Sequence, residues 1–240
     1  MIAIITQARV NSSRLPNKIF LEASGKPFLY HHIERLKKVG IPIIVATTNN
    51  GSEKPIIDFC NDNNTFYYCG SETDVLARYY ECAVKYNLST IIRVTSDCPL
   101  IDANIILKGL ALYFSKTDNK LVYVSNAIER TYPRGMDFEI FSFELLKEAF
   151  ENAVDLSDRE HVTPYIWKNK SGRVCVFHKK DKKDNSSYRI TLDTEEDKNL
   201  LTALFETYNA QNLYCNDIIR ILSKNPTLVA LNAHIEQKKV

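Results

Sequence analysis

The sequence predicts an α/β protein built on a doubly wound, mostly parallel sheet with helices on both faces. Two observations predict this fold class. Short apolar runs typical of buried strands alternate with segments whose apolar residues recur at helical spacing. Loops rich in small polar residues separate them, and this alternation is typical of βαβ units. We expect a single domain over the 240 residues of the chain.

The alternation is regular in the first half of the chain. Helices are expected where apolar residues repeat every three or four positions, as Ile105, Ile106, Leu110 and Tyr113 do. The expected strands are Ile2–Thr6, Ile41–Thr47, Thr65–Tyr68, Thr90–Val94 and Leu121–Ser125. The expected helices are Pro27–Lys38, Glu53–Asn63, Thr73–Tyr86 and Asp102–Ser115, the last with Asp102 as its N-cap.

The pattern is less regular after Asn126. Glu129–Glu139 is polar and turn-rich, which favours an excursion from the sheet at about residues 126–169. Further helices are expected at Phe141–Ala153, Asp158–Lys168, Thr194–Asn209 and Asp217–Ser223, and further strands at Arg173–Phe177 and Ser187–Leu192. No repeat, low-complexity stretch or linker divides the sequence.

Composition excludes several classes of protein. The sequence is 45% hydrophobic and 25% charged, as in ordinary soluble globular proteins. A net charge of +2 gives no support to nucleic-acid coating, and acids interrupt the basic run His178–Asp184. No apolar stretch is long enough for a membrane span, and the apolar start is too short for a signal peptide. Scattered cysteines without metal-site spacing suit reduced thiols in a cytosolic protein.

The loop Gln7–Lys18 is the first candidate for a binding site. Sheets of this class bind ligands beyond the carboxyl ends of their strands, and this loop follows the first strand. It carries Arg9, Arg14 and Lys18 among small polar residues, and Pro16 stiffens its exit. Such cations together with exposed backbone N–H groups favour phosphate, so we prefer phosphate binding to a surface loop with scattered charges.

Two carboxylates follow predicted strands. Asp97 comes after the fourth strand in the stretch RVTSDCPLID, and Asp193 follows Ser187–Leu192 in RITLDTEED. Carboxylates at adjacent strand ends can hold a hard cation such as Mg²⁺, which prefers oxygen ligands. The alternatives are a turn at Asp97 and a helix cap at Asp193 or Thr194, and spacing alone does not decide between them.

Two further groups of polar residues carry open alternatives. Gly70–Arg78 is a small polar turn that opens a helix, either as a binding turn or as a capping box with Ser71 or Thr73 as the cap. Tyr132–Glu139 and Asp158–His161 concentrate charged residues outside the regular elements. Residues that recognise a polar substrate have this composition, and so do subunit contacts and salt-bridged loops.

Taken in order, these motifs resemble the sugar nucleotidyltransferases that activate acidic sugars with CTP, the acylneuraminate and KDO cytidylyltransferase family. Gln7–Lys18 is similar to the family signature ARxxSxRLPxK, and the nearest branch is that of spore coat polysaccharide biosynthesis protein F. The resemblance continues through Ala46–Thr48, Gly70–Tyr80, Arg93–Asp102, Tyr132–Glu139, Arg159–Pro164, Leu192–Asp197 and Asn232–Lys238. Where the family usually has glycine, this chain has Asn11, Asn17 and Ser96.

The resemblance implies a Rossmann-like nucleotide-diphospho-sugar transferase fold. It also implies transfer of CMP from CTP to an acidic acceptor, with release of pyrophosphate, in surface polysaccharide biosynthesis. The implied catalytic residues are Arg14, Lys18 and Asp97, with Mg²⁺ held by Asp97 and Asp193. The implied nucleotide contacts are Ala8, Arg9, Asn11, Ser12, Arg14, Lys18, Thr47, Thr48, Gly70, Ser71 and Asp74. The implied acceptor residues are Tyr132, Arg134, Asp137, Glu139, Arg159 and His161.

The resemblance further implies a cytoplasmic homodimer that meets through Asn126–Asn169, without a nucleic-acid or membrane partner. Two other functions stay open. A metal-dependent glycosyltransferase uses the same sheet, but such enzymes usually carry Asp-x-Asp after the fourth strand, where this chain has Asp97 alone. A catalytically inactive nucleotide-binding scaffold is kept open by the departures from glycine, whereas the retained Lys18 and Asp193 argue against it.

Overall fold

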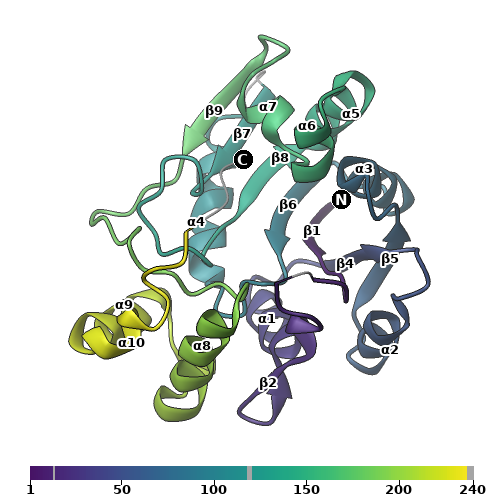
Figure 1. The fold of residues 1–240 in the computed structure, drawn as a ribbon. Helices are drawn as coiled ribbons and strands as arrows, with labels where there is room; N and C mark the ends of the chain where they lie inside the picture. The colour runs from purple at the N-terminus through teal and green to yellow at the C-terminus, as the bar shows by residue number, and fades with distance from the viewer. Residues whose placement is uncertain (13, 118–120, 237–240) are drawn as a thin grey trace.

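The computed structural model describes residues 1–12, 14–117 and 121–236, so residue 13 of the opening loop and residues 237–238 of the last motif lie outside it. In this part of the chain a seven-stranded sheet has the order β5-β4-β1-β6-β8-β7-β9 (Figure 1). Its pairs are parallel except those made by β8. Its strands are β1 (Ile2–Gln7), β4 (Ile43–Thr48), β5 (Phe66–Gly70), β6 (Thr90–Thr95), β7 (Leu121–Ser125), β8 (Glu139–Ser142) and β9 (Val174–His178). A small antiparallel pair joins β2 (Glu22–Ala23) to β3 (Lys26–Pro27).

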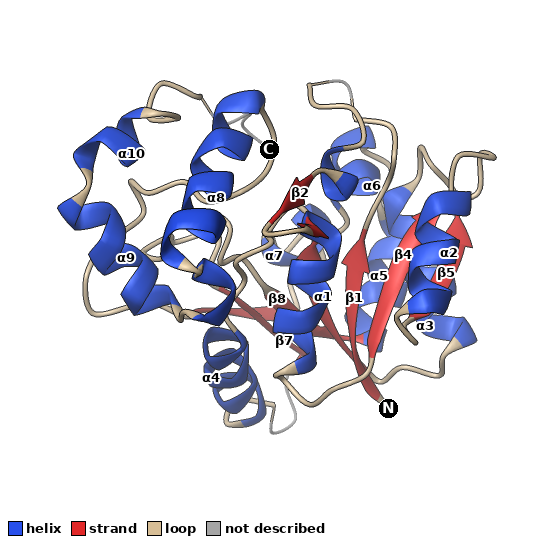
Figure 2. Cartoon of the chain, turned by 90° about the horizontal axis from the view of Figure 1, so that it is seen from below, coloured by secondary structure: helices blue, strands red, loops and turns tan. Residues whose placement is uncertain are grey.

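Helices cover both faces of the large sheet (Figure 2). Alternate residues of one strand point to opposite faces, so Ile4 shares a core with α1, α2, α4, α8 and α9, while Ile5 shares another with α3, α5 and α7. The helices are α1 (Phe28–Lys37), α2 (Lys54–Asp62), α3 (Val75–Lys85), α4 (Ala103–Phe114), α5 (Phe143–Asn152), α6 (Leu156–His161), α7 (Pro164–Trp167), α8 (Glu195–Tyr208), α9 (Cys215–Lys224) and α10 (Pro226–Ala230).

The predicted fold class and its regular first half are confirmed. Every strand and helix expected up to residue 125 forms, with ends that differ by at most two residues. Asp102 is the N-cap of α4, as expected, because its carboxylate accepts the Asn104 N–H over 2.8 Å. Each described helix is either too short or too polar to span a lipid bilayer. The single domain over residues 1–240, with its excursion at about 126–169, stays a prediction.

Two helix expectations after residue 126 need correction. The helix expected at Phe141–Ala153 begins later, because residues 139–142 form β8 between β6 and β7. Ser142 then caps α5 by accepting the Leu145 N–H over 3.2 Å. The helix expected at Asp158–Lys168 is two short helices, since Val162 has a φ of 72° and Pro164 begins a new turn.

The strand expected at Ser187–Leu192 does not form. Among the described residues, this segment makes one isolated β-bridge, between Arg189 and Arg134, and no longer strand pairing. Arg134 N donates to Tyr188 O over 2.9 Å, and Ile190 N donates to Arg134 O over 2.8 Å. Its apolar residues alternate as in a strand, but its backbone partners are loops. The stretch 187–193 is therefore an extended segment held by two loops.

Candidate active site

The loop after β1 lies at the carboxyl edge of the sheet. It starts beside β4, where Ala8 N donates to Ala46 O over 3.1 Å, and it turns back so that Asn17 N donates to Val10 O over 3.3 Å. Asn17 has a φ of 54°, in the left-handed region that asparagine enters more readily than most residues. A hollow on this loop is lined by Arg9, Val10, Asn11, Ser12, Pro16 and Asn17.

Asp97 and Asp193 meet at the end of this loop. Lys18 Nζ lies 3.1 Å from Asp97 Oδ2 and 2.8 Å from Asp193 Oδ1, so one ammonium group bridges both carboxylates. Arg14 Nη2 lies 3.4 Å from Asp193 Oδ1. The structure thus brings together the four charged residues that the sequence assigned to catalysis and metal binding.

The charges in this cluster stabilise one another. Burial lowers the pKa of Lys18, but the charges of Asp97 and Asp193 outweigh burial and the pKa is raised. Burial raises the pKa of Asp97, but the charge of Lys18 and hydrogen bonds from its neighbours outweigh burial and the pKa is lowered. Lys18 is therefore a cation and Asp97 an anion at neutral pH.

Asp193 reaches the site without following a strand, which corrects the sequence-based expectation. The turn after β6 holds the segment that carries it. Leu192 N donates to Asp97 O over 2.8 Å, and Thr191 Oγ1 donates to the same oxygen over 3.0 Å. The two carboxylates are close because the backbone of one segment is bonded to the backbone of the other.

Two helices near the site, α3 and α8, each begin at a polar residue that caps the helix. Thr194, not Asp193, caps α8, where its hydroxyl accepts a backbone N–H of that helix over 3.3 Å. Asp74 caps α3, accepting a backbone N–H of that helix over 2.9 Å, so Ser71 and Thr73 are not the cap. The capping alternative was correct for Thr194 but named the wrong residues at the start of α3.

The ends of β4 and β5 adjoin the start of the loop. Thr48 pairs with Gly70 across the sheet. Gly70 leaves no room for a side chain, because a Cβ there would lie 2.8 Å from the Tyr68 ring. The buried hydroxyl of Thr47 has no hydrogen-bond partner among the described residues. An orphaned buried polar atom is unusual, and its position makes this edge a candidate for ligand contact.

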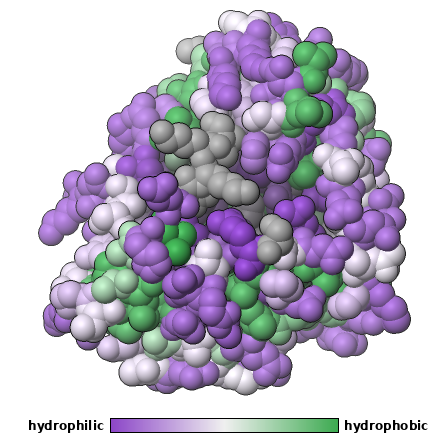
Figure 3. Space-filling model, in the orientation of Figure 1, coloured by the Kyte–Doolittle hydropathy of each residue, from purple (hydrophilic) through white to green (hydrophobic). Residues whose placement is uncertain are grey.

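A cavity of about 780 Å³ opens where β6 and β8 pair. Thr95, which ends β6 two residues before Asp97, forms part of its wall. Hydrophilic residues cover much of the face of the molecule seen in Figure 3. The lining residues are Arg93, Val94, Thr95, Tyr123, Ala127, Ile128, Arg130, Arg134, Asp137, Glu139, His161, Thr163, Pro164 and Trp167.

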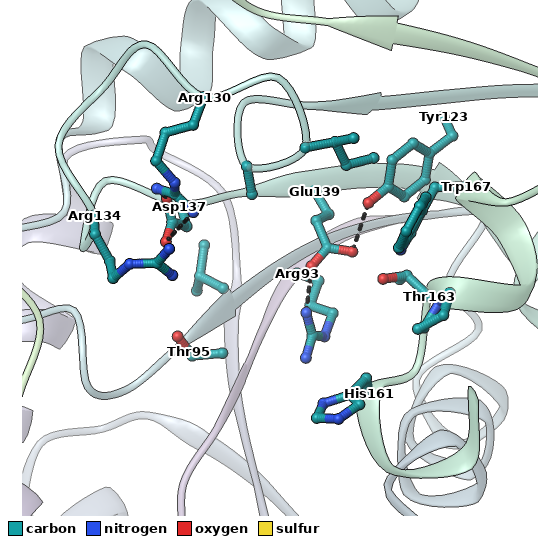
Figure 4. A pocket seen from close by; sticks show the side chains of 14 residues that line it. Arg93, Thr95, Tyr123, Arg130, Arg134, Asp137, Glu139, His161, Thr163 and Trp167 are labelled. Carbon is teal, nitrogen blue, oxygen red and sulfur yellow. Dashed lines mark hydrogen bonds and ion pairs between the residues drawn. The ribbon is translucent and has the colours of Figure 1, made fainter. Parts of the chain in front are cut away.

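One buried ion pair lies at the floor of the cavity (Figure 4). The Arg93 guanidinium pairs with Glu139, and Tyr123 Oη donates to the other carboxylate oxygen over 2.8 Å. Arg93 Nη2 also donates to Gln7 Oε1 over 3.1 Å, which ties the cavity to the end of β1. Burial lowers the pKa of Arg93, but Glu139 outweighs burial and the pKa is raised. Arg93 and Glu139 therefore form an ion pair, and together they add no net charge to the cavity.

The cavity wall also holds a second ion pair and one further positive charge. Arg130 binds Asp137 through both carboxylate oxygens. Arg134 adds a third guanidinium beside them, and burial together with the charge of Arg130 lowers its pKa (Figure 4). Burial also lowers the pKa of His161, which is therefore neutral at pH 7. With two neutral pairs and Arg134, the cavity suits an anionic group.

The structure gathers four of the six predicted acceptor residues in this cavity, namely Arg134, Asp137, Glu139 and His161. Tyr132 is buried in the core instead. Arg159 pairs with Asp74 and donates to Phe150 O over 2.8 Å, so it joins α6 to the start of α3.

The sequence interpretation missed ten residues of the cavity wall, among them Arg93, Tyr123, Arg130 and Trp167. One of them left a signal. Arg93 interrupts the otherwise apolar strand TIIRVT, and a charge inside a buried strand needs a buried partner. Tyr123 in β7, Trp167 in α7 and Arg130 in a turn fit their segments without an unpaired charge inside a strand, so the sequence pattern carries no such signal for them.

The chain matches known proteins over nearly its full length. The family model described as cytidylyltransferase matches residues 3–238. An uncharacterized protein of Methanocaldococcus jannaschii is 35% identical over 237 residues, which cover 98% of this chain and 95% of that protein. The spore coat polysaccharide biosynthesis protein SpsF of Bacillus subtilis is 26% identical over 234 residues, which cover 94% of this chain and 95% of that protein.

Solved structures share the fold. A cytidylyltransferase from Leptospira borgpetersenii has a TM-score of 0.88 and 30% sequence identity, with 99% of each chain covered. A CMP:2-keto-3-deoxy-manno-octonic acid synthetase complexed with CTP has a TM-score of 0.61 and 18% identity, with 88% of this chain and 99% of that chain covered, and is alike in fold. The family match includes both carboxylates and the loop that leads to Lys18, and the chain belongs to the cytidylyltransferase family.

Proposed function

We propose that this protein transfers CMP from CTP to an acidic sugar or related acceptor, with release of pyrophosphate, in surface polysaccharide biosynthesis. One observation carries the proposal. Lys18 bridges Asp97 and Asp193 at the end of the cationic loop, and Thr95, two residues before Asp97, lines a cavity with one excess positive charge. A triphosphate on the loop and an anionic acceptor in the cavity would meet at this cluster.

The nucleotide side of the site consists of the loop and the ends of β4 and β5. Arg9 and Arg14 would hold phosphate oxygens, since a guanidinium offers paired N–H donors to such groups. The orphaned hydroxyl of Thr47 and the close-packed turn at Gly70 support contact with the cytidine at this edge. The cytidylyltransferase match supports CTP as the nucleotide.

The two carboxylates fit a Mg²⁺ ion by the chemistry of their oxygens. Both already converge on one positive charge, the Lys18 ammonium. No cluster of three or more potential metal ligands exists among the described residues, so Asp97 and Asp193 would share the ion with substrate phosphates, as is usual for Mg²⁺. The chemistry that such an ion supplies is charge neutralisation between phosphates and a lower pKa of the attacking hydroxyl.

The reaction itself is a displacement at phosphorus. An acceptor hydroxyl oxygen attacks the α-phosphorus in line and gives its proton to solvent, the bond to the bridging oxygen of the β-phosphate breaks, and pyrophosphate leaves with that electron pair. Arg14 and Lys18 would offset the charge that builds on the leaving group, because catalysis of this kind depends mainly on positioning and neutralisation. Arg134 would orient the acceptor by its anionic group.

We further propose a cytoplasmic homodimer that meets through the region Asn126–Asn169. Val154 and Leu156, in this region, are 88% and 86% exposed. Large aliphatic side chains this exposed are uncommon on a monomer surface when they stand together. Burial against a second copy would remove both from water. Gel filtration with light scattering tests this part of the proposal, and a monomer at micromolar concentration would contradict it.

The test of the proposed activity has two arms. Pyrophosphate release is measured with CTP, Mg²⁺ and a panel of sugar carboxylates, phosphonates and phosphates, and we expect release with at least one of them. Thermal unfolding is measured with each nucleotide and Mg²⁺, because a ligand of the native state raises the melting temperature. A larger shift with GTP or UTP than with CTP would contradict the cytidylyl assignment. CTP binding without release on any acceptor would favour the inactive scaffold.

A further inference from the structure

Behind Asp193 lies a buried polar cluster that the reaction described above does not use. It consists of Arg189, Asp197 and Asn232, and each of the three is at most 8% exposed. Asp193 faces it with one oxygen, because Arg189 Nη2 donates to Asp193 Oδ2 over 3.1 Å. The other oxygen, Oδ1, accepts from Lys18 over 2.8 Å. The cluster therefore sits on the side of the carboxylate opposite to the site.

Asp197 holds both the guanidinium and the backbone on which Asp193 depends. Arg189 donates from Nε and Nη2 to the two oxygens of Asp197, each over 2.7 Å. The backbone N–H of Asp193 donates to Asp197 Oδ2 over 3.0 Å. A bidentate pair of this kind fixes the plane of the guanidinium, which in turn fixes the direction of its remaining donors. The direction of the Asp193 carboxylate is thereby set from Asp197.

Asn232 completes the cluster from the turn that follows α10. Its Nδ2 donates to Asp197 Oδ1 over 2.8 Å and to Arg189 O over 3.0 Å. A neutral amide adds two donors without adding a charge, so it orients the ion pair and leaves its charge balance unchanged. This contact gives a role to Asn232, for which the sequence offered none.

We propose that Asn232 and Asp197 are positioning residues that aim the Asp193 carboxylate at Lys18 by way of Arg189. The purpose of this aim, nucleotidyl transfer, rests on the proposed function. A purely structural cluster would only fasten the turn after α10 to the rest of the fold. Positioning differs from fastening in one consequence, since its loss changes the surroundings of Lys18 and a structural loss leaves them unchanged.

The chemical reactivity of Lys18 measures that consequence directly. Lys18 Nζ lies against two carboxylates, which hold the amine in place and shield it from reagents. If Asn232→Ala lets Asp193 turn away, Lys18 keeps only one of these two partners, and we expect its amine to react several-fold faster. Competitive acetylation of the whole protein at one fixed pH, followed by mass spectrometry of the Lys18 peptide, reads this change.

Asn225→Ala is the matched control. Asn225 also uses its side-chain amide on a backbone carbonyl, donating to Ile221 O over 2.7 Å, but it lies between α9 and α10 and touches none of the cluster. We expect both variants to lower the melting temperature and only Asn232→Ala to raise the reactivity of Lys18. Equal Lys18 reactivity in wild type and in folded Asn232→Ala overturns the proposal.

Asn232→Ser keeps the test available if the alanine variant does not fold. A serine hydroxyl donates one hydrogen bond where the amide donates two, so we expect Lys18 reactivity between that of wild type and that of alanine. Wild-type reactivity in Asn232→Ser, together with its loss of stability, also overturns the proposal. Acetylation needs no nucleotide. Absence of pyrophosphate release in the wild type therefore contradicts the proposed function while the Lys18 result still decides the positioning.

Discussion

Up to residue 125 the charged groups of the carboxylate cluster follow parallel strands: Asp97 lies in the turn after β6, and Lys18 begins a short 3-10 helix (Lys18–Phe20) at the end of the loop after β1. Asp193, beyond that point, lies in an extended segment that joins no sheet and is bonded to the turn at Asp97. The first region places its residues by sheet topology, and the second places them by contact with the first. Substitution of Asp97 in the first region should therefore remove chemistry, while substitutions in the cavity of the second region should change binding of the acceptor.

The strongest test of this contrast is Asp97→Asn. The variant keeps the shape of the side chain but removes one of the two negative charges that lie beside Lys18. We expect the rate of pyrophosphate release to fall by about a hundredfold or more. Circular dichroism should show an unchanged fold. Steady-state kinetics with CTP and an active acceptor measure the effect, and full activity would remove Asp97 from the site.

Asp102→Asn is the control for that experiment. Asp102 lies five residues later, caps α4 and accepts the Cys215 N–H over 2.7 Å, so its role is structural. Asparagine is as good an N-cap as aspartate, but it has one acceptor oxygen where the carboxylate uses two, so one of these hydrogen bonds is lost. We expect the free energy of unfolding to fall by about 1 kcal/mol, with little change in turnover. A large loss of turnover in this variant would show that the assay responds to stability.

The sequence predicted the first region well because its signals are local. Apolar runs and caps mark each element, and the ends of parallel strands share one edge, which is enough to bring Lys18 and Asp97 together. It predicted Asp193 for a wrong reason, as the end of a strand that does not form. Tyr132 and Arg159 were predicted to bind the acceptor, but Tyr132 lies in the core and Arg159 in an ion pair with Asp74. The sequence could not predict these places, because burial and pairing between distant segments leave no local pattern.

Arg134→Met tests whether the second region binds the acceptor, and its effect on the kinetics should be the next largest. Arg134 supplies the excess positive charge of the cavity, and a charge-assisted hydrogen bond contributes about 1.5–3 kcal/mol. We expect the KM for an acidic acceptor to rise about tenfold to a hundredfold, with the KM for CTP unchanged. Arg134→Lys keeps the charge and should fall between the two. An unchanged acceptor KM would place the anionic group of the acceptor elsewhere.

His32, in α1, also holds the turn that carries Asp97. This buried ring has Nδ1 2.9 Å from Cys98 O and Nε2 2.9 Å from Thr6 Oγ1. Burial lowers the pKa of His32 to about 4, against about 6.5 in the unfolded chain. The unfolded chain therefore binds the extra proton first as pH falls. Stability that is present above about pH 6.5 is lost as the pH falls toward about 4.

We expect this residue to lower the free energy of unfolding by about 2 kcal/mol between about pH 6.5 and pH 5. His32→Gln should be less stable at neutral pH but lack this part of the pH dependence. Urea unfolding of both proteins at the two pH values measures the difference in slope. Equal slopes would mean that another group, and not the neutral His32, holds the turn.

The smallest effect is expected at Asn17, one of the positions where the family resemblance leads us to expect glycine. Asn17 has a φ of 54°, and asparagine tolerates this conformation, so Asn17→Gly should leave the KM for CTP within about twofold. Asn17→Val should cost about 1–2 kcal/mol of stability, because a branched side chain is strained there. Asn11, the other departure in this loop, is not among the residues with positive φ. A large gain in CTP affinity from Asn17→Gly would therefore mean that the side chain itself, and not the backbone, limits how closely the loop approaches the phosphates.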